Sequence, residues 1–529
     1  MIRTMTNMSL AKNVIDQLLN AGVKEFCLCP GARNSPFVFL FDENPHLKIY
    51  TFFDERSAAF FALGRIAATR LPVAVFTTSG TAVAELLPAA VEATYSSLPL
   101  ILVTADRPKR YRGSGAPQSI QQVGLFSYYI EASFDLDEEN THISMNGLSW
   151  KKPTHINVCF AEPLMDGPIP QIQIPERTHR TRFPVAIPMD MVDQFHEFLR
   201  KNRPLVILST IPEKSRESVI NFLARLQAPI YAEGISGLRS HPTLKPFILK
   251  SGERILHQLL DKEICTGILR VGGVPTIRLW RDLEDKRIDV PVFSFGYNHF
   301  TGLSRQIPHF DDLDDLGRIE IENPQPLEQE WITRDQKMSQ VLLDLLAKHP
   351  MAEPSIVKKV STWMHQSYVY LGNSLPIREW DLAADHEVNP LRVVGNRGAN
   401  GIDGQVSTFL GWCRADQSHW CLVGDLTSMY DLSSLWISEQ LPKMKIRILI
   451  LNNSGGQIFD QMFKRDVFVN RHQINFKNWA AMWNWDYALW EKVPDDPSSL
   501  SERQIVEIKI SAQATENFIK EWEAAWNKA

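Results

Sequence analysis

Short runs of almost purely apolar residues alternate with helical patterns along most of this chain. Near its start the runs EFCLC, VAVFTTSG and LPLILVTAD are separated by segments with helical spacing of apolar residues. Strands that are apolar throughout are typical of parallel sheets covered on both faces. Parallel strands also need crossover connections, which the helical segments supply. The sequence therefore predicts an α/β fold with doubly wound, mainly parallel sheets.

The same pattern assigns individual helices. It predicts a helix in LAKNVIDQLLNAG near the start, a helix over residues 57–69, and one continuous helix in TAVAELLPAAVEATYSS. Each lies between two apolar runs, as expected for a crossover.

At 529 residues the chain is too long for one hydrophobic core. A proline-rich polar stretch at residues 167–184 reads as a linker, and strand-helix alternation restarts beyond it. A helix-rich passage near residue 331 separates a further set of apolar runs. We therefore expect three α/β domains, at residues 1–183, 184–335 and 336–529.

Composition narrows the function classes. The net charge is −5, with 44% hydrophobic and 22% charged residues, which gives no general attraction to nucleic acid. No apolar run is long enough to insert in a bilayer, and the N-terminus lacks the pattern of a signal peptide. The six cysteines lack metal-ligand spacing and are expected to be reduced and buried. These features favour a cytoplasmic protein.

One segment holds a Gly-Asp pair and an Asn-Asn pair, each at the end of an apolar run: VGDLTSMYDLSSLWISEQLPKMKIRILILNNSGGQIF. One crossover with a helix at about residues 430–440 would bring Asp425 and Asn453 to the carboxyl edge of a parallel sheet, where ligands bind. Their oxygens, with a carbonyl from the glycine turn, suit Mg²⁺ and a diphosphate. A helix-capping Asp and a polar strand end would explain the same residues without a ligand.

This segment resembles the diphosphate motif of thiamine diphosphate enzymes, a GDG followed by NN, although Leu426 replaces the last glycine. The combination GDL, YDL and NNSGGQIF is similar to one branch, the 2-succinyl-5-enolpyruvyl-6-hydroxy-3-cyclohexene-1-carboxylate (SEPHCHC) synthases of menaquinone biosynthesis. Further similar stretches occur in the family's order: CPGARNSP, FFDER, TTSGTAVAELLPA, TADRP, GAPQSIQQVGLF and PTHINVCFAEPL. The resemblance covers the first and last predicted domains and is vague in the middle one.

Thiamine diphosphate chemistry needs a carboxyl group against the aminopyrimidine ring, and partial desolvation raises the proton affinity of such a group. The stretch IYTFFDERSAAFFALG supplies Glu55, after a strand-like run and among Phe52, Phe53, Phe60 and Phe61. The resemblance implies that Glu55 is the catalytic, cofactor-activating acid. Taken alone, it could equally be a Glu at a helix start, stabilised by the helix dipole.

The resemblance further implies a transferase that decarboxylates 2-oxoglutarate on thiamine diphosphate, with Mg²⁺ or Mn²⁺, and adds the succinyl carbanion equivalent to isochorismate. Asp425, Asn453 and Gly455 match its metal-binding positions, with Asn452 in a supporting role. The positions that match its cofactor site are Glu55, Ile402, Gly424, Asp425, Leu426, Thr427, Asn453, Gly455, Gln457 and Ile458. Ile402 resembles the apolar wedge that bends the cofactor.

Both implied substrates are dicarboxylates, which arginine forks bind well. The residues at matching substrate positions are Arg33, Arg107, Gln118, Arg278, Ser374, Arg378, Arg397, Ile458 and Phe459. Two departures concern substrate anchoring. Ala32 stands where the family often has Ser, a contact that Asn34 could replace. Ile277 occupies one position of a basic pair, leaving Arg278 alone.

Two other classes remain as alternatives. An acetolactate-synthase-like enzyme would share the cofactor but act on small monocarboxylates, which need no set of four arginines. A catalytically silent paralogue would be expected to lose Glu55 or Asp425, and both are present. In this superfamily the acid and the diphosphate site usually meet across a subunit interface, which implies a homodimer or homotetramer. The sequence alone also allows them to meet within one chain.

Overall fold

A computed structural model describes residues 5–176 and 187–528, except for the side chain of Gln461. The chain divides into two compact units, which are described separately. The first unit comprises Met1–Arg182, Asn396–Asp416 and Thr427–Met444. The second comprises Phe183–Gly395, Gln417–Leu426 and Lys445–Ala529. Each unit is thus built from segments that are separated in the sequence.

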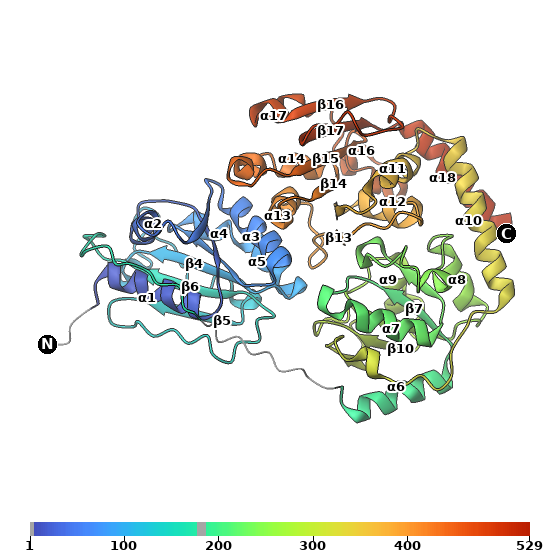
Figure 1. The fold of residues 1–529 in the computed structure, drawn as a ribbon, viewed down its shortest axis with the longest axis horizontal. Coiled ribbons are helices and arrows are strands. Elements are labelled where there is room, and N and C mark those ends of the chain that lie inside the picture. The colour runs from blue at the N-terminus through green and yellow to red at the C-terminus, as the bar shows by residue number, and fades with distance from the viewer. Residues whose placement is uncertain (1–4, 177–186, 529) are drawn as a thin grey trace. The chain divides into compact units, whose positions relative to one another are not determined.

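The first unit contains a six-stranded parallel sheet of order β2-β1-β3-β4-β6-β5 (Figure 1). Its strands are β1 (Glu25–Leu28), β2 (Lys48–Thr51), β3 (Val73–Thr77), β4 (Leu100–Asp106), β5 (Ala132–Leu136) and β6 (Thr154–Cys159). Its helices are α1 (Asn7–Asn20), α2 (Ser35–Asp42), α3 (Glu55–Thr69), α4 (Thr81–Ala84), α5 (Leu87–Ser96) and α13 (Gln405–Trp412), with the 3-10 helices η1 (Lys109–Tyr111), η2 (Ser127–Tyr129) and η8 (Ser434–Gln440).

Helices cover this sheet because its strands carry apolar side chains on both faces. On one face Phe26 and Phe76 pack with the apolar sides of α1 and α2 in a single buried cluster. Tyr50, on β2, instead contacts Phe61 of α3, with ring centroids 4.8 Å apart. The prediction of a doubly wound parallel sheet is confirmed here.

Helix α13 packs closely on α3 because both helices carry glycine at the contact. A Cβ atom at Gly64 would lie 2.0 Å from the carbonyl oxygen of Thr408, and one at Gly411 would lie 2.1 Å from that of Phe61. The Arg65 guanidinium also donates to the carbonyl oxygens of Gly411 and Cys413. The segment 396–416 is therefore an integral part of the first unit.

The second unit contains two parallel sheets. The middle sheet has the order β11-β10-β9-β7-β8. Its strands are β7 (Pro204–Leu208), β8 (Ile230–Ala232), β9 (Gly267–Val271), β10 (Val292–Phe295) and β11 (His309–Phe310), and its helices are α6 (Met189–Lys201), α7 (Arg216–Leu226), α8 (Arg254–Asp261) and α9 (Arg278–Asp285). Two separate apolar clusters, one containing Leu205 and Ile207 and the other Val206 and Leu208, show that both faces are covered.

The last sheet has the order β13-β12-β14-β15-β17-β16. Its strands are β12 (Tyr368–Leu371), β13 (Arg392–Val394), β14 (Ser418–Gly424), β15 (Lys445–Asn452), β16 (Asp486–Trp490) and β17 (Arg503–Lys509). The helices of this part are α10 (Gln329–Lys348), α11 (Glu353–Ser361), α12 (Leu375–Ala383), α15 (Asp460–Phe463), α16 (Asp466–Val469), α17 (Lys477–Met482) and α18 (Ala512–Lys528). The three sheets together agree with the predicted three parallel α/β folds.

Several predicted helices differ in detail. The stretch predicted as one helix after β3 forms two helices, α4 and α5. Pro88 lies in the first turn of α5, a position where proline favours the start of a new helix. Helix α3 starts two residues earlier than predicted, at Glu55, because the Asp54 side chain caps it by accepting from the Ser57 N–H.

The predicted helix at about residues 430–440 is also wrong. The structure has α14 (Asp425–Tyr430), a turn, and then the 3-10 helix η8. Asp431 lies in the turn, where its carboxylate accepts hydrogen bonds from the segment 404–407. Part of the linker predicted at residues 167–184 lies outside the described residues.

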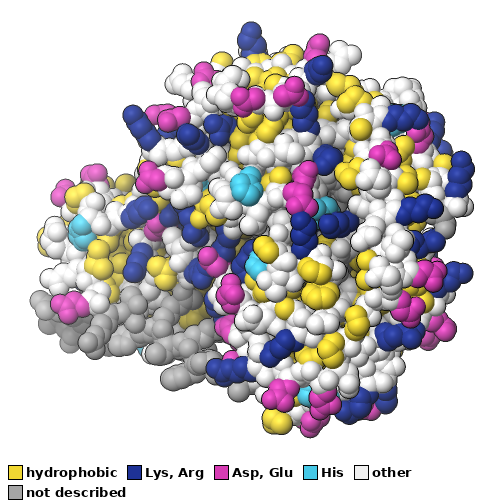
Figure 2. Space-filling view, turned by 45° about the vertical axis from the view of Figure 1, so that its right-hand side comes forward, with side chains coloured by type: hydrophobic (Ala, Val, Ile, Leu, Met, Phe, Trp, Pro, Cys, Tyr) yellow, Lys and Arg dark blue, Asp and Glu magenta, His cyan; other side chains and the backbone are white. Residues whose placement is uncertain are grey.

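Figure 2 shows Lys and Arg side chains interspersed with Asp and Glu side chains on the face in view. None of the described helices is both long enough and apolar enough to span a bilayer.

Candidate functional site

The Gly-Asp and Asn-Asn pairs lie at the ends of two neighbouring strands. Strands β14 and β15 pair in parallel, with Gly424 opposite Leu451. Asp425 therefore follows one strand at the sheet edge where Asn452 ends the other. The predicted crossover is confirmed, and the two motifs share the carboxyl edge of the last sheet.

Asp425 is held in place by both of its carboxylate oxygens. Oδ1 accepts from the Leu426 N–H at 2.7 Å, and Oδ2 accepts from the Gly455 N–H at 3.0 Å. Nε2 of His472 lies 3.1 Å from Oδ2. The side chain is almost fully buried, and this burial raises its pKa despite the opposing effect of these neighbours. The contact with Gly455 ties the two motifs together directly.

Asn453 presents a free oxygen at the same edge. Its Nδ2 donates to Oε2 of Glu353 at 3.0 Å, and the Gln457 side chain donates to its backbone oxygen at 3.0 Å. Its Oδ1 is buried and has no hydrogen-bond partner among the described residues. Asn452, by contrast, bonds within the protein, to the carbonyl of Ile474 and to Glu507. Of the two amides, Asn453 is thus the one with an oxygen left for a ligand.

The turn after Asn453 depends on a glycine. Gly455 has φ +134°, and a Cβ atom there would lie 2.4 Å from the carbonyl oxygen of Val469. Only glycine fits this conformation and space without a backbone shift. The turn brings the Gly455 backbone against Asp425.

These groups fit a hard divalent cation. A buried carboxylate, an unpartnered amide oxygen and a backbone carbonyl of a glycine turn are the kinds of oxygen ligand that Mg²⁺ uses. The described parts of the chain hold no group of three or more His, Cys, Asp and Glu side chains able to bind a metal ion. A cation at this edge would therefore rely on amide, backbone and phosphate oxygens beside one carboxylate.

Glu55 is the first residue of α3 in the first unit, directly after β2. Burial raises its pKa, and its own backbone N–H opposes the shift. Phe52, Phe60 and Phe61 are buried nearby in the sequence as predicted, but Phe53 is 57% exposed. Phe53 instead packs edge-on against Trp436. The half-buried carboxyl has the raised proton affinity expected of the cofactor-activating acid.

Two buried acids hold the loop that carries Arg397 and Ile402. Glu92 accepts from the N–H groups of Gly398 at 2.8 Å and Ala399 at 2.7 Å. Asp431 accepts from the N–H groups that begin α13, including that of Gly404 at 3.0 Å, and contacts Arg56 at 3.3 Å. Burial raises the pKa of Glu92 and raises that of Asp431 to about 6. The loop is thus fixed at both ends within the first unit.

Arg33 and Arg107 follow the carboxyl ends of β1 and β4. Arg33 is largely buried, donates to the Phe160 carbonyl at 3.1 Å and pairs with Glu162 at 3.1 Å. Asn34 spends both amide atoms on its own loop, bonding the Gly31 N–H and the Cys29 carbonyl. Both ends of the Asn34 amide are therefore already hydrogen-bonded, so Asn34 is not free to replace the contact that a Ser at position 32 would make.

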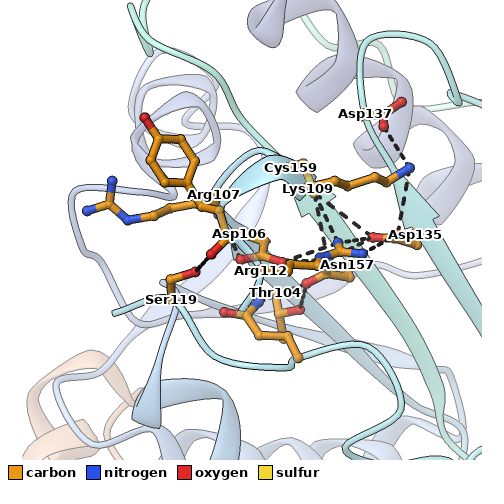
Figure 3. A network of polar contacts seen from close by, with 12 residues as sticks. Thr104, Asp106, Arg107, Lys109, Arg112, Ser119, Asp135, Asp137, Asn157 and Cys159 are labelled. Carbon is orange, nitrogen blue, oxygen red and sulfur yellow. Dashed lines mark hydrogen bonds and ion pairs between the residues drawn. The ribbon is translucent and has the colours of Figure 1, made fainter. Parts of the chain in front are cut away.

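A polar network supports the loop of Arg107 and Gln118 (Figure 3). Arg112 bonds Asp135 through both Nη atoms, at 2.8 and 2.6 Å, and reaches Asp106 at 3.3 Å. Asn157 joins the same two carboxylates. The Arg107 side chain points away from this cluster, with its Nε bonded to the Pro117 carbonyl at 3.0 Å. Gln118, with φ 55°, is exposed.

The remaining predicted residues are placed as follows. Ser374 precedes α12 with φ 74°, and Arg378 is exposed on that helix. Arg278 pairs with Asp282 on its own helix at 2.9 Å and is half exposed. Thr427 is buried, Leu426, Gln457 and Ile458 are half-buried, and Phe459 is 40% exposed.

The predicted residues divide between the two units. The first unit holds Arg33, Glu55, Arg107, Gln118, Arg397, Ile402 and Thr427. The second holds Arg278, Ser374, Arg378, Gly424, Asp425, Leu426, Asn453, Gly455, Gln457, Ile458 and Phe459. Within the second unit the structure brings the Asp425 carboxylate and the turn of Asn453 and Gly455 together.

Sequence reasoning missed Glu353, Glu92, Asp431 and His472. Asp431 stands in the YDL stretch that carried the family resemblance, so a signal for it was present. Glu353 lies 100 positions before Asn453, and only folding brings them together.

Comparisons with known proteins agree with this geometry. Residues 8–125 match the family model described as "Thiamine pyrophosphate enzyme, N-terminal TPP binding domain". A 2-succinyl-5-enolpyruvyl-6-hydroxy-3-cyclohexene-1-carboxylate synthase of Bdellovibrio bacteriovorus is 54% identical over 99% of this chain and 100% of its own length. The chain belongs to the SEPHCHC synthase family. Two further synthases of the same name are also similar. The one from Akkermansia muciniphila is 34% identical over 96% of this chain and 97% of its own length. The one from Chloroflexus aurantiacus is 31% identical over 90% of this chain and 88% of its own length.

Family membership makes thiamine diphosphate a cofactor of this chain. The Gly-Asp and Asn-Asn pairs retain two explanations, a site for its diphosphate and metal ion, or a capping Asp and a polar strand end. The middle sheet, where the sequence resemblance was vague, falls within the stretch covered by the B. bacteriovorus relative.

Proposed function

We propose that this chain decarboxylates 2-oxoglutarate and adds the succinyl carbanion equivalent to isochorismate, giving SEPHCHC and CO₂ in menaquinone biosynthesis. The observation that carries the proposal is the full-length identity of 54% to a synthase of that name. The family favours this reaction over that of an acetolactate-synthase-like enzyme. Thiamine diphosphate, when bound, supplies the electron sink that decarboxylation of a 2-oxo acid requires.

The residues of the chain would then have separate tasks. Asp425, Asn453 and the Gly455 backbone would hold Mg²⁺ or Mn²⁺ and, through it, the diphosphate. Gly424, Leu426, Thr427, Gln457 and Ile458 would line the same cofactor, and Ile402 would support its bent shape. Support for this assignment comes from the free Asn453 Oδ1 and from the bond between Gly455 and Asp425.

Glu55 would exchange a proton with the aminopyrimidine ring. Its raised pKa supports this role, because a half-buried carboxyl retains a proton more readily than an exposed one. The arginines Arg33, Arg107, Arg278, Arg378 and Arg397, with Gln118, Ser374, Ile458 and Phe459, would bind the dicarboxylate substrates. Among these residues the substrate-binding role is best supported for Arg107, because its guanidinium points away from the acidic network beside it.

The test is direct. Purified protein is mixed with thiamine diphosphate, Mg²⁺, 2-oxoglutarate and isochorismate, and loss of isochorismate absorbance is followed. We expect turnover with 2-oxoglutarate and almost none with pyruvate, which lacks the second carboxylate. Consumption of pyruvate without loss of isochorismate, together with no turnover of 2-oxoglutarate, would overturn the proposal in favour of the acetolactate-type reaction.

We further propose a homo-oligomer, a dimer or a tetramer, in which Glu55 of one subunit serves the metal site of another, as is usual in this superfamily. Glu55→Gln and Asp425→Ala variants are each expected to be inactive. After subunit exchange in equal amounts, mixed dimers would carry one intact site, restoring about a quarter of wild-type activity. No recovery despite demonstrated exchange would contradict shared sites.

A cytoplasmic location is also proposed. Its support is that all six cysteines are free and buried, as suits a reducing compartment. Cell fractionation with an antibody against the chain would test it, and recovery from the membrane fraction would contradict it.

A further inference from the structure

Glu353 lies behind the amide that is proposed to bind the metal. It is the first residue of α11 and is only 2% exposed. Its Oε2 accepts from Asn453 Nδ2 at 3.0 Å, across 100 positions of sequence. Its backbone N–H donates to Oγ1 of Thr515 at 3.0 Å, which fixes the start of the helix. A buried carboxylate is therefore held directly against the Asn453 side chain.

This contact decides which end of the Asn453 amide faces the cation site. The oxygen and nitrogen ends of a carboxamide have nearly the same shape, so their orientation depends on their hydrogen-bond partners. In the observed contact Oε2 of Glu353 accepts the hydrogen bond, so the NH₂ end of the amide faces it. Oδ1 is left as the buried atom without a hydrogen-bond partner among the described residues. A metal ion can be bound only by that oxygen end.

We propose that Glu353 is a positioning residue for the metal site, which holds Asn453 with its amide oxygen directed to the cation. The inference rests on the proposed function, because it takes Asn453 as a metal ligand. Without the carboxylate, the amide can rotate and present its NH₂ group, which repels a cation. Loss of a hydrogen bond that orients a metal ligand lowers metal affinity by about 10–100-fold.

A neighbouring glutamate provides a matched control. Glu379 also has a buried carboxylate oxygen, Oε2, without a hydrogen-bond partner among the described residues. Burial and the charge of Glu353 raise the pKa of Glu379. Glu379→Gln therefore removes a nearby buried carboxyl while leaving the bond between Glu353 and Asn453 in place.

The experiment measures the Mg²⁺ concentration at which full-length protein half-saturates with thiamine diphosphate, by calorimetry. Glu353→Leu removes the acceptor, and Glu353→Asp keeps the charge but withdraws it by one methylene. We expect both variants to need about 10–100-fold more Mg²⁺. Glu353→Gln can accept or donate, so it no longer selects one end of the Asn453 amide and should fall between wild type and Glu353→Leu, whereas Glu379→Gln should stay close to wild type. Melting temperatures of the cofactor-free variants check folding, and the Asp and Gln variants carry the test if the Leu variant does not fold.

Asn453→Ala separates the two levels of the argument. If Asn453→Ala leaves the Mg²⁺ requirement unchanged, the metal assignment of the proposed function fails. If it raises the requirement and Glu353→Leu and Glu353→Asp do not, only the positioning role of Glu353 is overturned. A positioning role also predicts that Glu353→Leu adds nothing in the Asn453→Ala background, whereas additive effects would contradict it.

Discussion

Glu55 and Asp425 are both acids placed directly after a strand, but their surroundings differ. Both oxygens of Asp425 accept backbone hydrogen bonds, and His472 lies beside one of them. Burial raises the pKa of Glu55, and the charges of Asp54 and Glu85 raise it further. Among the groups that shape this pKa, only its own backbone N–H forms a hydrogen bond with it. The acid proposed to move a proton is left free, whereas the acid proposed to hold a cation is fixed in position.

The largest expected effect comes from removing the proton-transfer group. Glu55→Gln keeps the shape of the side chain but cannot exchange the proton, so the rate of carboligation should fall by about 10²–10⁴-fold. Mg²⁺-dependent cofactor binding, measured by calorimetry, should stay near wild type. Retained turnover would remove Glu55 from this role.

Replacement of the fixed acid should give the opposite pattern. Asp425→Ala removes a proposed direct ligand of the metal ion. It should weaken Mg²⁺-dependent cofactor binding by at least about 10–100-fold, which is the loss typical when a residue that only orients a metal ligand is removed. Asp466→Asn is the control, because Asp466 is 81% exposed in the same unit. Unchanged cofactor affinity in Asp425→Ala by calorimetry would exclude the metal assignment.

The rigidity of the metal edge can be tested through its glycines. Gly455→Ala introduces a Cβ atom 2.4 Å from a carbonyl at a strained φ, which should cost about 1–3 kcal/mol in the free energy of unfolding. In Gly456→Ala the same carbonyl is 3.4 Å away, so the variant should fold as wild type. Denaturant unfolding of the two variants measures the difference between their free energies of unfolding, and equal stabilities would argue against a tight turn.

A pH-dependent effect of comparable size concerns Asp431, which fixes the loop of Ile402 in the first unit. Its folded pKa is raised from 3.8 to about 6, so its contribution to stability is fully present below pH 3.8 and is lost as pH rises through 6. The loss is at most about 1.4 kcal/mol per pH unit within that window. Wild type should therefore lose stability relative to Asp431→Asn between pH 4 and 6. Parallel pH profiles of the two melting temperatures would contradict the shift.

The sequence predicted the fold well where periodicity was strong. The apolar runs became buried parallel strands, and the crossover from Asp425 to Asn453 was confirmed. The failures involve local competition that a periodic pattern does not reveal. Pro88 divided one predicted helix, and Asp431 turned its carboxylate to the start of α13 instead of continuing a helix.

The site was predictable only in its linear motifs. Asp425 and Asn453 were singled out because they follow or end neighbouring strands, and Glu55 because its neighbours in the sequence match a family; their roles stay predictions. Glu353 and Glu92 are single glutamates on helices, a residue type that is most often solvated, and nothing in their local sequence indicates burial. Their partners are 100 and 306 positions away. Such contacts follow from the topology of the folded chain.

The close packing of α3 on α13 has a consequence for folding during synthesis. The first unit includes Asn396–Asp416 and Thr427–Met444, so the 182 residues synthesised first cannot complete it. At about 5–20 residues per second, the face of α3 around Gly64 waits roughly 17–70 s for its partner helix to be synthesised. During this interval an apolar helical surface is open to chaperones and to other nascent chains. The glycines that give the finished unit its tight contact thus also create a period of vulnerability during translation.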